Sequence, residues 1–118
     1  MAAQKEKSGT VLVVEDTFVR SFVKTYLQRH DLNVVATGVP QAEDILNSAE
    51  TTVDLLITNR PDLFEKTARG IPLLYLAAFP DPEEAAKFQH ARMLKKPFRP
   101  EQLLSAVQDL MHELPLAS

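Results

Sequence analysis

The sequence predicts an α/β fold with a doubly wound, five-stranded parallel sheet. Five short apolar runs rich in β-branched residues alternate with five segments of helical character. A continuous apolar run is typical of a strand that is buried on both faces, as in a sheet covered by helices on each side. The chain has 118 residues, 45% of them apolar, which is enough for one core. We therefore expect a flexible tail at 1–9, one domain at 10–114 and a short remainder at 115–118.

The strands are predicted from apolar runs bounded by turn residues. Gly38 ends the second run, and Pro72 lies near the start of the fourth, where a missing N–H donor is tolerated. The predicted strands cover residues 10–14, 33–37, 53–58, 71–78 and 92–95.

Three of the predicted helices have an apolar face, in which apolar residues recur every three or four positions. Pro40 suits the first turn of the second of these helices, and Pro100 opens the last. The three faces consist of Phe18, Val19, Phe22, Val23, Tyr26 and Leu27, then Ala42, Ile45, Leu46 and Ala49, and finally Leu103, Leu104, Val107, Leu110, Met111 and Leu114.

The other two predicted helices are short. Residues 62–69 are expected to form a short helix that ends at Gly70. Further along, Asp81 suits the N-cap of a helix and Pro82 its first position, with Glu83 in the first turn. This start predicts a helix that continues to His90.

Composition excludes several classes of protein. The net charge is −3 without a Lys/Arg cluster, so no direct nucleic-acid contact is expected. No apolar stretch is long enough for a membrane span, and no signal-peptide pattern opens the chain. There is no Cys and hence no disulfide or thiolate metal site. We expect a cytoplasmic protein without a membrane partner.

Candidate functional residues follow the strands, because ligands of parallel α/β sheets bind beyond the carboxyl ends of the strands. These positions are 15–17, 38, 59–61, 77–79 and 96–97. None carries a glycine-rich phosphate loop, and two acids follow the first strand, which argues against nucleotide binding. The three histidines have no metal-ligand spacing and are expected to face solvent: His30, His90 and His112.

Charged side chains at two strand ends could form a site. Glu15 and Asp16 offer two hard oxygen donors, which suit Mg²⁺. Alternatively, they form a solvated pair in which one acid caps the following helix. Lys96, which precedes Pro97, could neutralise an anion or pair with an acid, or be an ordinary surface charge.

Three segments together resemble the receiver domain of bacterial response regulators, a flavodoxin-like fold. They are Val-Leu-Val-Val-Glu-Asp at 11–16, Asp-Leu-Leu-Ile-Thr-Asn at 54–59 and Leu-Lys-Lys-Pro-Phe at 94–98. The resemblance covers about residues 10–114 and implies a cis bond between Lys96 and Pro97. It also implies that an aspartate after the third strand accepts a phosphoryl group from a histidine kinase, with Mg²⁺ held by that aspartate and the acid pair.

The chain departs from this family at the positions that carry the chemistry. Asn59 stands at the phosphoacceptor position, five residues after Asp54. Ala77 replaces the switch Thr or Ser, and Met93 replaces the switch aromatic residue. The segment between Asn59 and Ala77 is also shorter than is usual in the family, which implies a shortened third helix. The resemblance therefore indicates a degenerate member, a pseudo-receiver without a catalytic residue, in which Lys96 and Pro97 are retained.

Either of two cations, Mg²⁺ or the ammonium group of Lys96, could lie beside the acid pair. Glu15, Asp16 and Asn59 could bind Mg²⁺, but only weakly, because they have one formal negative charge fewer than the family's set. In the reading that we favour, Lys96 replaces the cation and pairs with Asp16 or Glu15, since buried charges need partners. Asp62 is an alternative acceptor but is expected to cap the short helix. Arg60 could lie over the crevice and bind an anion.

We expect a non-enzymatic module of two-component signalling that needs no cofactor and works by phosphorylation-independent protein contact. Its partner would be a histidine kinase, an output domain or another regulator, and homodimerisation would use the face of the fourth helix, fifth strand and fifth helix. A working phosphoacceptor, at Asp62 or after deamidation of Asn59, is one alternative. A domain that binds a small ligand or anion is another. The chain could be a whole protein or one domain of a longer regulator.

Overall fold

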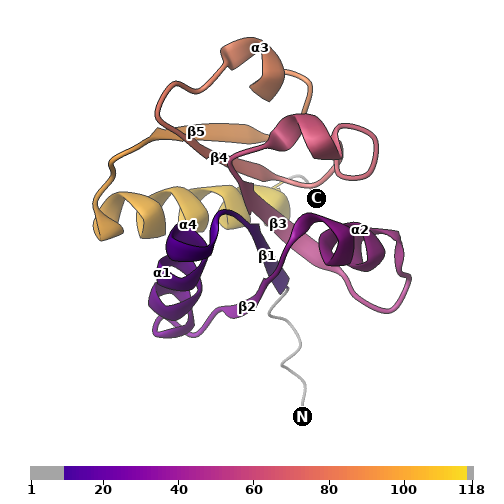
Figure 1. The fold of residues 1–118 in the computed structure, drawn as a ribbon, viewed down its shortest axis with the longest axis horizontal. Coiled ribbons are helices and arrows are strands. Elements are labelled where there is room, and N and C mark those ends of the chain that lie inside the picture. Colours follow the sequence, from indigo (N-terminus) through magenta and orange to yellow (C-terminus); the bar gives the residue numbers. More distant parts are fainter. Residues whose placement is uncertain (1–9, 117–118) are drawn as a thin grey trace.

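The computed structural model describes residues 10–116, which form a five-stranded parallel sheet of order β2-β1-β3-β4-β5 (Figure 1). Each pair of neighbouring strands runs parallel. The predicted α/β fold is thus confirmed. The tail predicted at 1–9 and residues 117–118 lie outside the described residues. The strands are β1 (Thr10–Val14), β2 (Asn33–Ala36), β3 (Val53–Thr58), β4 (Leu73–Ala77) and β5 (Ala91–Lys95).

Four α-helices and one 3-10 helix connect and cover these strands. They are α1 (Thr17–Gln28), α2 (Val39–Asn47), the 3-10 helix η2 (Pro61–Phe64), α3 (Pro82–Ala85) and α4 (Pro100–Leu116). Ala49 lies past the end of α2 and is exposed, although we predicted it on the apolar face of that helix. The helix ends early because Ser48 is extended and its hydroxyl accepts the N–H of Glu50 at 3.0 Å.

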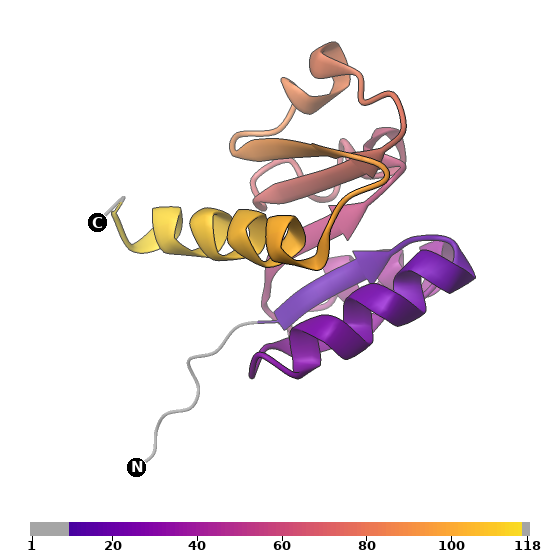
Figure 2. The same ribbon diagram turned by 90° about the vertical axis from the view of Figure 1, so that its left-hand side faces the viewer.

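The helices form two layers, one on each face of the sheet. Figure 2 shows α1 and α4 together on one face, whereas α2, η2 and α3 lie on the other. Successive residues of a strand point to opposite faces, so Val11 and Val13 pack with α1 and α4 while Leu12 and Val14 pack on the opposite side. Both cores are therefore built from the same continuous apolar runs.

The predicted helix at 62–69 is wrong in extent, because only η2 and a series of turns occupy this region. The short connection must place the side chains of both Phe64 and Ala68 in the core, where they are buried. An i→i+3 helix is typical of such short connectors. The shortened third helix that the resemblance implied is thus a single 3-10 segment.

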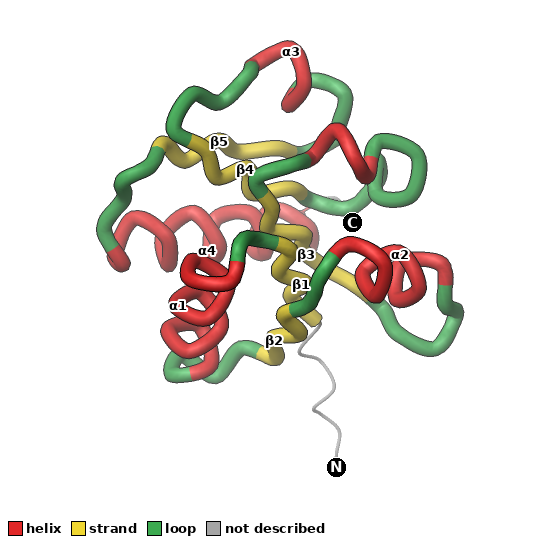
Figure 3. Tube along the Cα trace, viewed as in Figure 1, coloured by secondary structure: helices red, strands yellow, loops and turns green. Residues whose placement is uncertain are grey.

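The predicted helix from Asp81 to His90 has the predicted start but ends after one turn. Asp81 caps α3 through a carboxylate oxygen that accepts the N–H of Glu83 at 3.0 Å. Tighter i→i+3 hydrogen bonds follow it, from the N–H groups of Lys87 and Phe88, and the N–H of Gln89 then donates to the carbonyl of Arg69 at 3.1 Å. Figure 3 shows the chain between β4 and β5 mostly as loop. β5 is consequently exposed at most of its positions.

Candidate functional site

The carboxyl ends of four parallel strands bring the predicted site residues to one edge of the sheet. Val14 and Thr58 are partners in register, so the residues that follow them, Glu15 and Asn59, leave neighbouring strands at the same level. The N–H of Lys96 donates to the carbonyl of Ala77 at 2.8 Å. The bond between Lys96 and Pro97 is cis. The sheet thus places the acid, the amide and the lysine at the same edge.

The central contact of this site is an ion pair between Lys96 and Glu15. The ammonium nitrogen Nζ of Lys96 lies 3.2 Å from Oε1 of Glu15. The Glu15 side chain has no exposed surface, and that of Lys96 is 24% exposed. The predicted ion pair is therefore confirmed, and its acid is Glu15 rather than Asp16.

The Glu15 carboxylate is only partly satisfied. Its Oε1 accepts the Lys96 ammonium and also the backbone N–H of Asp16 at 3.2 Å, whereas its Oε2 is buried without a hydrogen-bond partner. Burial raises the pKa of Glu15, and the nearby Lys96 offsets only part of this effect. The environment therefore resists the negative charge on Glu15 even with its cation in place.

Asp16 serves the helix that follows it. Its Oδ1 accepts the N–H of Val19 at 3.1 Å, which makes Asp16 the N-cap of α1. The side chain is exposed. The alternative in which one acid of the pair caps the next helix is thus confirmed for Asp16, but its neighbour Glu15 is buried rather than solvated.

Asn59 is half-buried directly after β3, and the chain turns immediately beyond it. The N–H of Arg60 donates to Oγ1 of the buried Thr58 at 3.1 Å, which fixes this turn. The Arg60 guanidinium donates to both carboxylate oxygens of Asp62, at 3.0 and 2.8 Å.

The expected role of Asp62 as a helix cap is wrong, because Asp62 lies inside η2 and Arg60 precedes that helix. The hydrogen bonds from Arg60 lower the pKa of Asp62. The Arg60 guanidinium therefore pairs with its exposed neighbour Asp62. This pairing does not support the predicted role of Arg60 as an anion-binding residue at the strand ends.

The residues at the strand ends fit an ammonium better than Mg²⁺. One oxygen of Glu15 already binds Lys96, and one oxygen of Asp16 caps α1. Within residues 10–116, no three or more Asp, Glu, His or Cys side chains are grouped so that they could hold a metal ion. The weak magnesium site predicted at Glu15, Asp16 and Asn59 stays a prediction.

Tyr75 makes a polar contact that was not predicted from the sequence. Its register partner across β4 and β5 is Met93, which is 41% exposed. The Tyr75 hydroxyl accepts the N–H of Asp81 at 3.3 Å and so ties β4 to the start of α3. The residue stands inside an apolar run, where an aromatic ring indicates core packing and its hydroxyl gives no separate signal.

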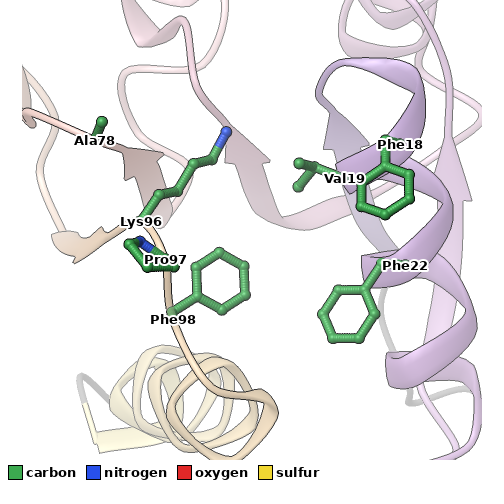
Figure 4. A pocket seen from close by; sticks show the side chains of 7 residues that line it. All are labelled: Phe18, Val19, Phe22, Ala78, Lys96, Pro97 and Phe98. Carbon is green, nitrogen blue, oxygen red and sulfur yellow. The ribbon is translucent and has the colours of Figure 1, made fainter.

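An apolar pocket of about 440 Å³ opens beside Lys96 (Figure 4). Three α1 side chains stand on one side of it: Phe18, Val19 and Phe22. Ala78 and the run 96–98 line the other side. The Phe22 and Phe98 ring centroids are 6.4 Å apart.

This pocket corrects the predicted core face of the first helix. Val23 and Leu27 are buried as predicted, but Phe18 is 84% exposed and Phe22 39% exposed. Both aromatic residues face the connection between β5 and α4 instead of the sheet. Spacing alone could not distinguish Phe18 and Phe22 from the buried residues of the same helix.

The three histidines are exposed, as predicted. His30 packs its ring against Tyr26 with centroids 4.9 Å apart, and neither His90 nor His112 lines the pocket beside Lys96. No helix among the described residues has the length and apolar character needed to cross a membrane.

Comparison with known proteins identifies the architecture. No family model and no curated protein matches the sequence. A response regulator receiver protein from Sinorhizobium medicae superposes with a TM-score of 0.74 at 19% identity, over 92% of this chain and 98% of that one. A CheY-like response regulator receiver domain protein from Methanospirillum hungatei gives 0.74 at 17% identity, over 95% and 100%. The receiver domain of the hybrid histidine kinase CckA gives 0.70 at 22% identity, over 87% and 99%.

The chain has a receiver fold. The strand order and helical layers described above are those of these response regulator domains, so the resemblance predicted the architecture correctly. At identities of 17–22% the likeness establishes the receiver fold, while the roles of individual residues rest on their own geometry.

Proposed function

We propose that this receiver fold acts as a non-enzymatic module of two-component-type signalling, through phosphorylation-independent contact with a protein partner. Support comes from Asn59 at the end of β3, where the resemblance places the phosphoacceptor aspartate. A carboxamide is neutral and a poor nucleophile, so it cannot form an acyl phosphate by the mechanism of the family.

The ion pair between Lys96 and Glu15 is the main structural support for this proposal. The resemblance assigns Lys96 to the oxygens of a phosphoryl group, but here its ammonium is engaged by a buried carboxylate of the same molecule. Ala77 supplies no hydroxyl to help. The site therefore has a neutral amide where the family has a nucleophile, no hydroxyl at Ala77, and a lysine that already contacts Glu15.

Under this proposal the module requires no Mg²⁺. Lys96 already places one positive charge against the buried Glu15, and a divalent ion would have to displace it. Any magnesium binding at Glu15, Asp16 and Asn59 is expected to be weak.

The proposed partner is a histidine kinase, an output domain or another regulator, and the proposed contact surface comprises α3, β5 and α4. Exposed residues of β5, among them Met93 and Lys95, support this placement because the single turn of α3 leaves them uncovered. A second copy of the chain could use the same surface. Neither nucleic acid nor membrane is a proposed partner.

A phosphoacceptor role for Asp62 is the competing function. Both of its carboxylate oxygens accept hydrogen bonds from Arg60. These are the oxygens that would have to attack a phosphoryl group if Asp62 were the acceptor. The pairing favours a structural role for Asp62 over a chemical one.

Intact mass after incubation with Mg²⁺ and acetyl phosphate tests the proposal. We expect the native chain to gain no phosphoryl group, and a conventional receiver domain treated in parallel serves as the positive control. A stoichiometric, base-labile adduct on the native chain would overturn the proposal. Peptide mapping would then begin at Asp62 and Asp16.

A further inference from the structure

The pocket beside Lys96 has the size of a small-molecule site. Its volume of about 440 Å³ lies within the range of about 300–1,000 Å³ that is usual for such sites. It lies between the start of α1 and the connection from β5 to α4, at the carboxyl edge of the sheet. This edge is where parallel α/β sheets bind their ligands.

The residues that line the pocket are apolar except for Lys96. Phenylalanine rings face it from both sides, Phe18 and Phe22 from α1 and Phe98 from the opposite side (Figure 4). Phe18 is 84% exposed. The Phe22 and Phe98 rings already contact each other, with centroids 6.4 Å apart. A flat apolar body would therefore lie against the exposed Phe18 and beside this pair, and would remove these rings from water.

Lys96 provides the polar contact that such an occupant would need. Its ammonium has three N–H donors, and the contact with Glu15 uses one of them. Glu15 and Asp16 do not line the pocket, but Oε1 of Glu15 lies 3.2 Å from the same Nζ, so an anionic occupant would share the ammonium with Glu15. The occupant should therefore present a hydrogen-bond acceptor, and a negative charge should strengthen the contact.

We propose that this pocket binds a small planar aromatic carboxylate, with its ring against the exposed Phe18, beside the Phe22–Phe98 pair, and its carboxylate at Nζ of Lys96. This inference stands independently of the proposed function, because it requires only the pocket and its lining. Such a ligand would give the module an input that needs no phosphoryl group.

Titration with 2-naphthoate, followed by two-dimensional ¹H–¹⁵N NMR, tests the proposal on the full chain. We expect saturable shifts of the backbone amides of Phe18, Phe22, Lys96 and Phe98. The uncharged 2-naphthamide should bind more weakly by roughly threefold or more, because it lacks the charge that pairs with Lys96. Equal affinity for the carboxylate and the carboxamide would overturn the assignment of Lys96.

Two phenylalanine substitutions form a matched pair for the same titration. Phe18→Ala should weaken 2-naphthoate binding by roughly three- to tenfold, because an aromatic contact is lost. Phe79→Ala removes an equally exposed ring, 87% exposed, that does not line the pocket, and should leave the affinity unchanged. Absence of saturable shifts at millimolar ligand, or an equal effect of both substitutions, would overturn the proposal.

Discussion

Lys96 and Glu15 show how one buried charge depends on another. The Glu15 side chain has no exposed surface, and its charge is balanced by an ammonium that reaches it from the far end of the sequence. Desolvation of an ion costs several kcal/mol unless a partner compensates for it. The pair therefore couples the end of β1 to the start of the β5–α4 connection.

Replacement of Lys96 by alanine should lower the free energy of unfolding by roughly 1–3 kcal/mol at pH 7, because Glu15 would remain buried without its cation. Lys96 is 24% exposed, so the loss should be smaller than for a fully buried pair. Urea denaturation measures the change. Lys66→Ala, at an exposed position in a turn, is the control and should stay within about ±0.5 kcal/mol. A neutral result for Lys96→Ala would mean that solvent compensates Glu15.

The pH dependence of stability should report on Glu15 directly. Because the pKa of Glu15 is raised in the folded state, the native protein binds its proton more tightly than the unfolded chain does. The contribution of Glu15 is fully present below its ordinary pKa of 4.5 and is lost as the pH rises through the raised value. The native chain should therefore lose stability relative to Glu15→Gln as the pH increases from 4 to 7.

Urea denaturation of both proteins at several pH values across this range checks that expectation. The other titrating groups are common to the two proteins, so the difference isolates Glu15. Parallel pH profiles would show that Glu15 has the same pKa in the folded and unfolded states.

At the scale of the element, the start of α1 depends on Asp16 as a cap rather than as a charge. Asp16→Ala should lower the free energy of unfolding by about 1 kcal/mol, because the N–H of Val19 loses its acceptor. Asp16→Asn should be close to neutral, since asparagine caps helices about as well as aspartate. Thermal denaturation of both variants checks the prediction. An equal loss in both would indicate that the negative charge, and not the hydrogen bond, stabilises the helix.

Elements with strong periodicity could be predicted from the sequence, and short elements fixed by distant contacts could not. The run from Thr10 to Val14 could form little other than a buried strand. In contrast, the predicted helix does not reach His90, because the N–H of Gln89 donates to the carbonyl of Arg69, a contact between segments that local pattern does not encode. The same limit applies to η2, whose extent is set by the need to bury Phe64 and Ala68.

The residues of the candidate site could be predicted from the sequence, but the contacts between their side chains could not. Strand ends indicated Glu15, Asn59 and Lys96, because the topology of a parallel sheet brings such positions together. Which acid would meet Lys96 depended on side-chain direction, since Glu15 turns inward while Asp16 caps α1. The aromatic pocket escaped prediction because Phe18 and Phe22 share the spacing of core residues.

At the scale of the whole molecule, restoring one residue should not restore a switch. Asn59→Asp returns a carboxylate to the end of β3, but Ala77 still lacks a hydroxyl and Met93 still lacks an aromatic ring. We expect that acetyl phosphate treatment of this variant leaves the NMR shifts of β5 and α4 residues unchanged. Beryllofluoride in place of acetyl phosphate provides a stable second test. Phosphoryl uptake accompanied by shifts across β5 and α4 would contradict this expectation.

The two margins of the sheet differ in how they discourage unwanted pairing. In the described part of the chain, β2 and β5 are the outermost strands, and each has one neighbour. An open strand edge is a template for a further strand from another molecule. β2 offers only four residues, and β5 carries Lys95 as well as Arg92, whose guanidinium pairs with Asp109 at 2.8 Å, so a second copy that approached β5 edge to edge would meet the Lys95 ammonium. Salt that screens this charge should therefore increase edge-to-edge self-association at high protein concentration, a colloidal property that follows from the place of one strand in the sheet.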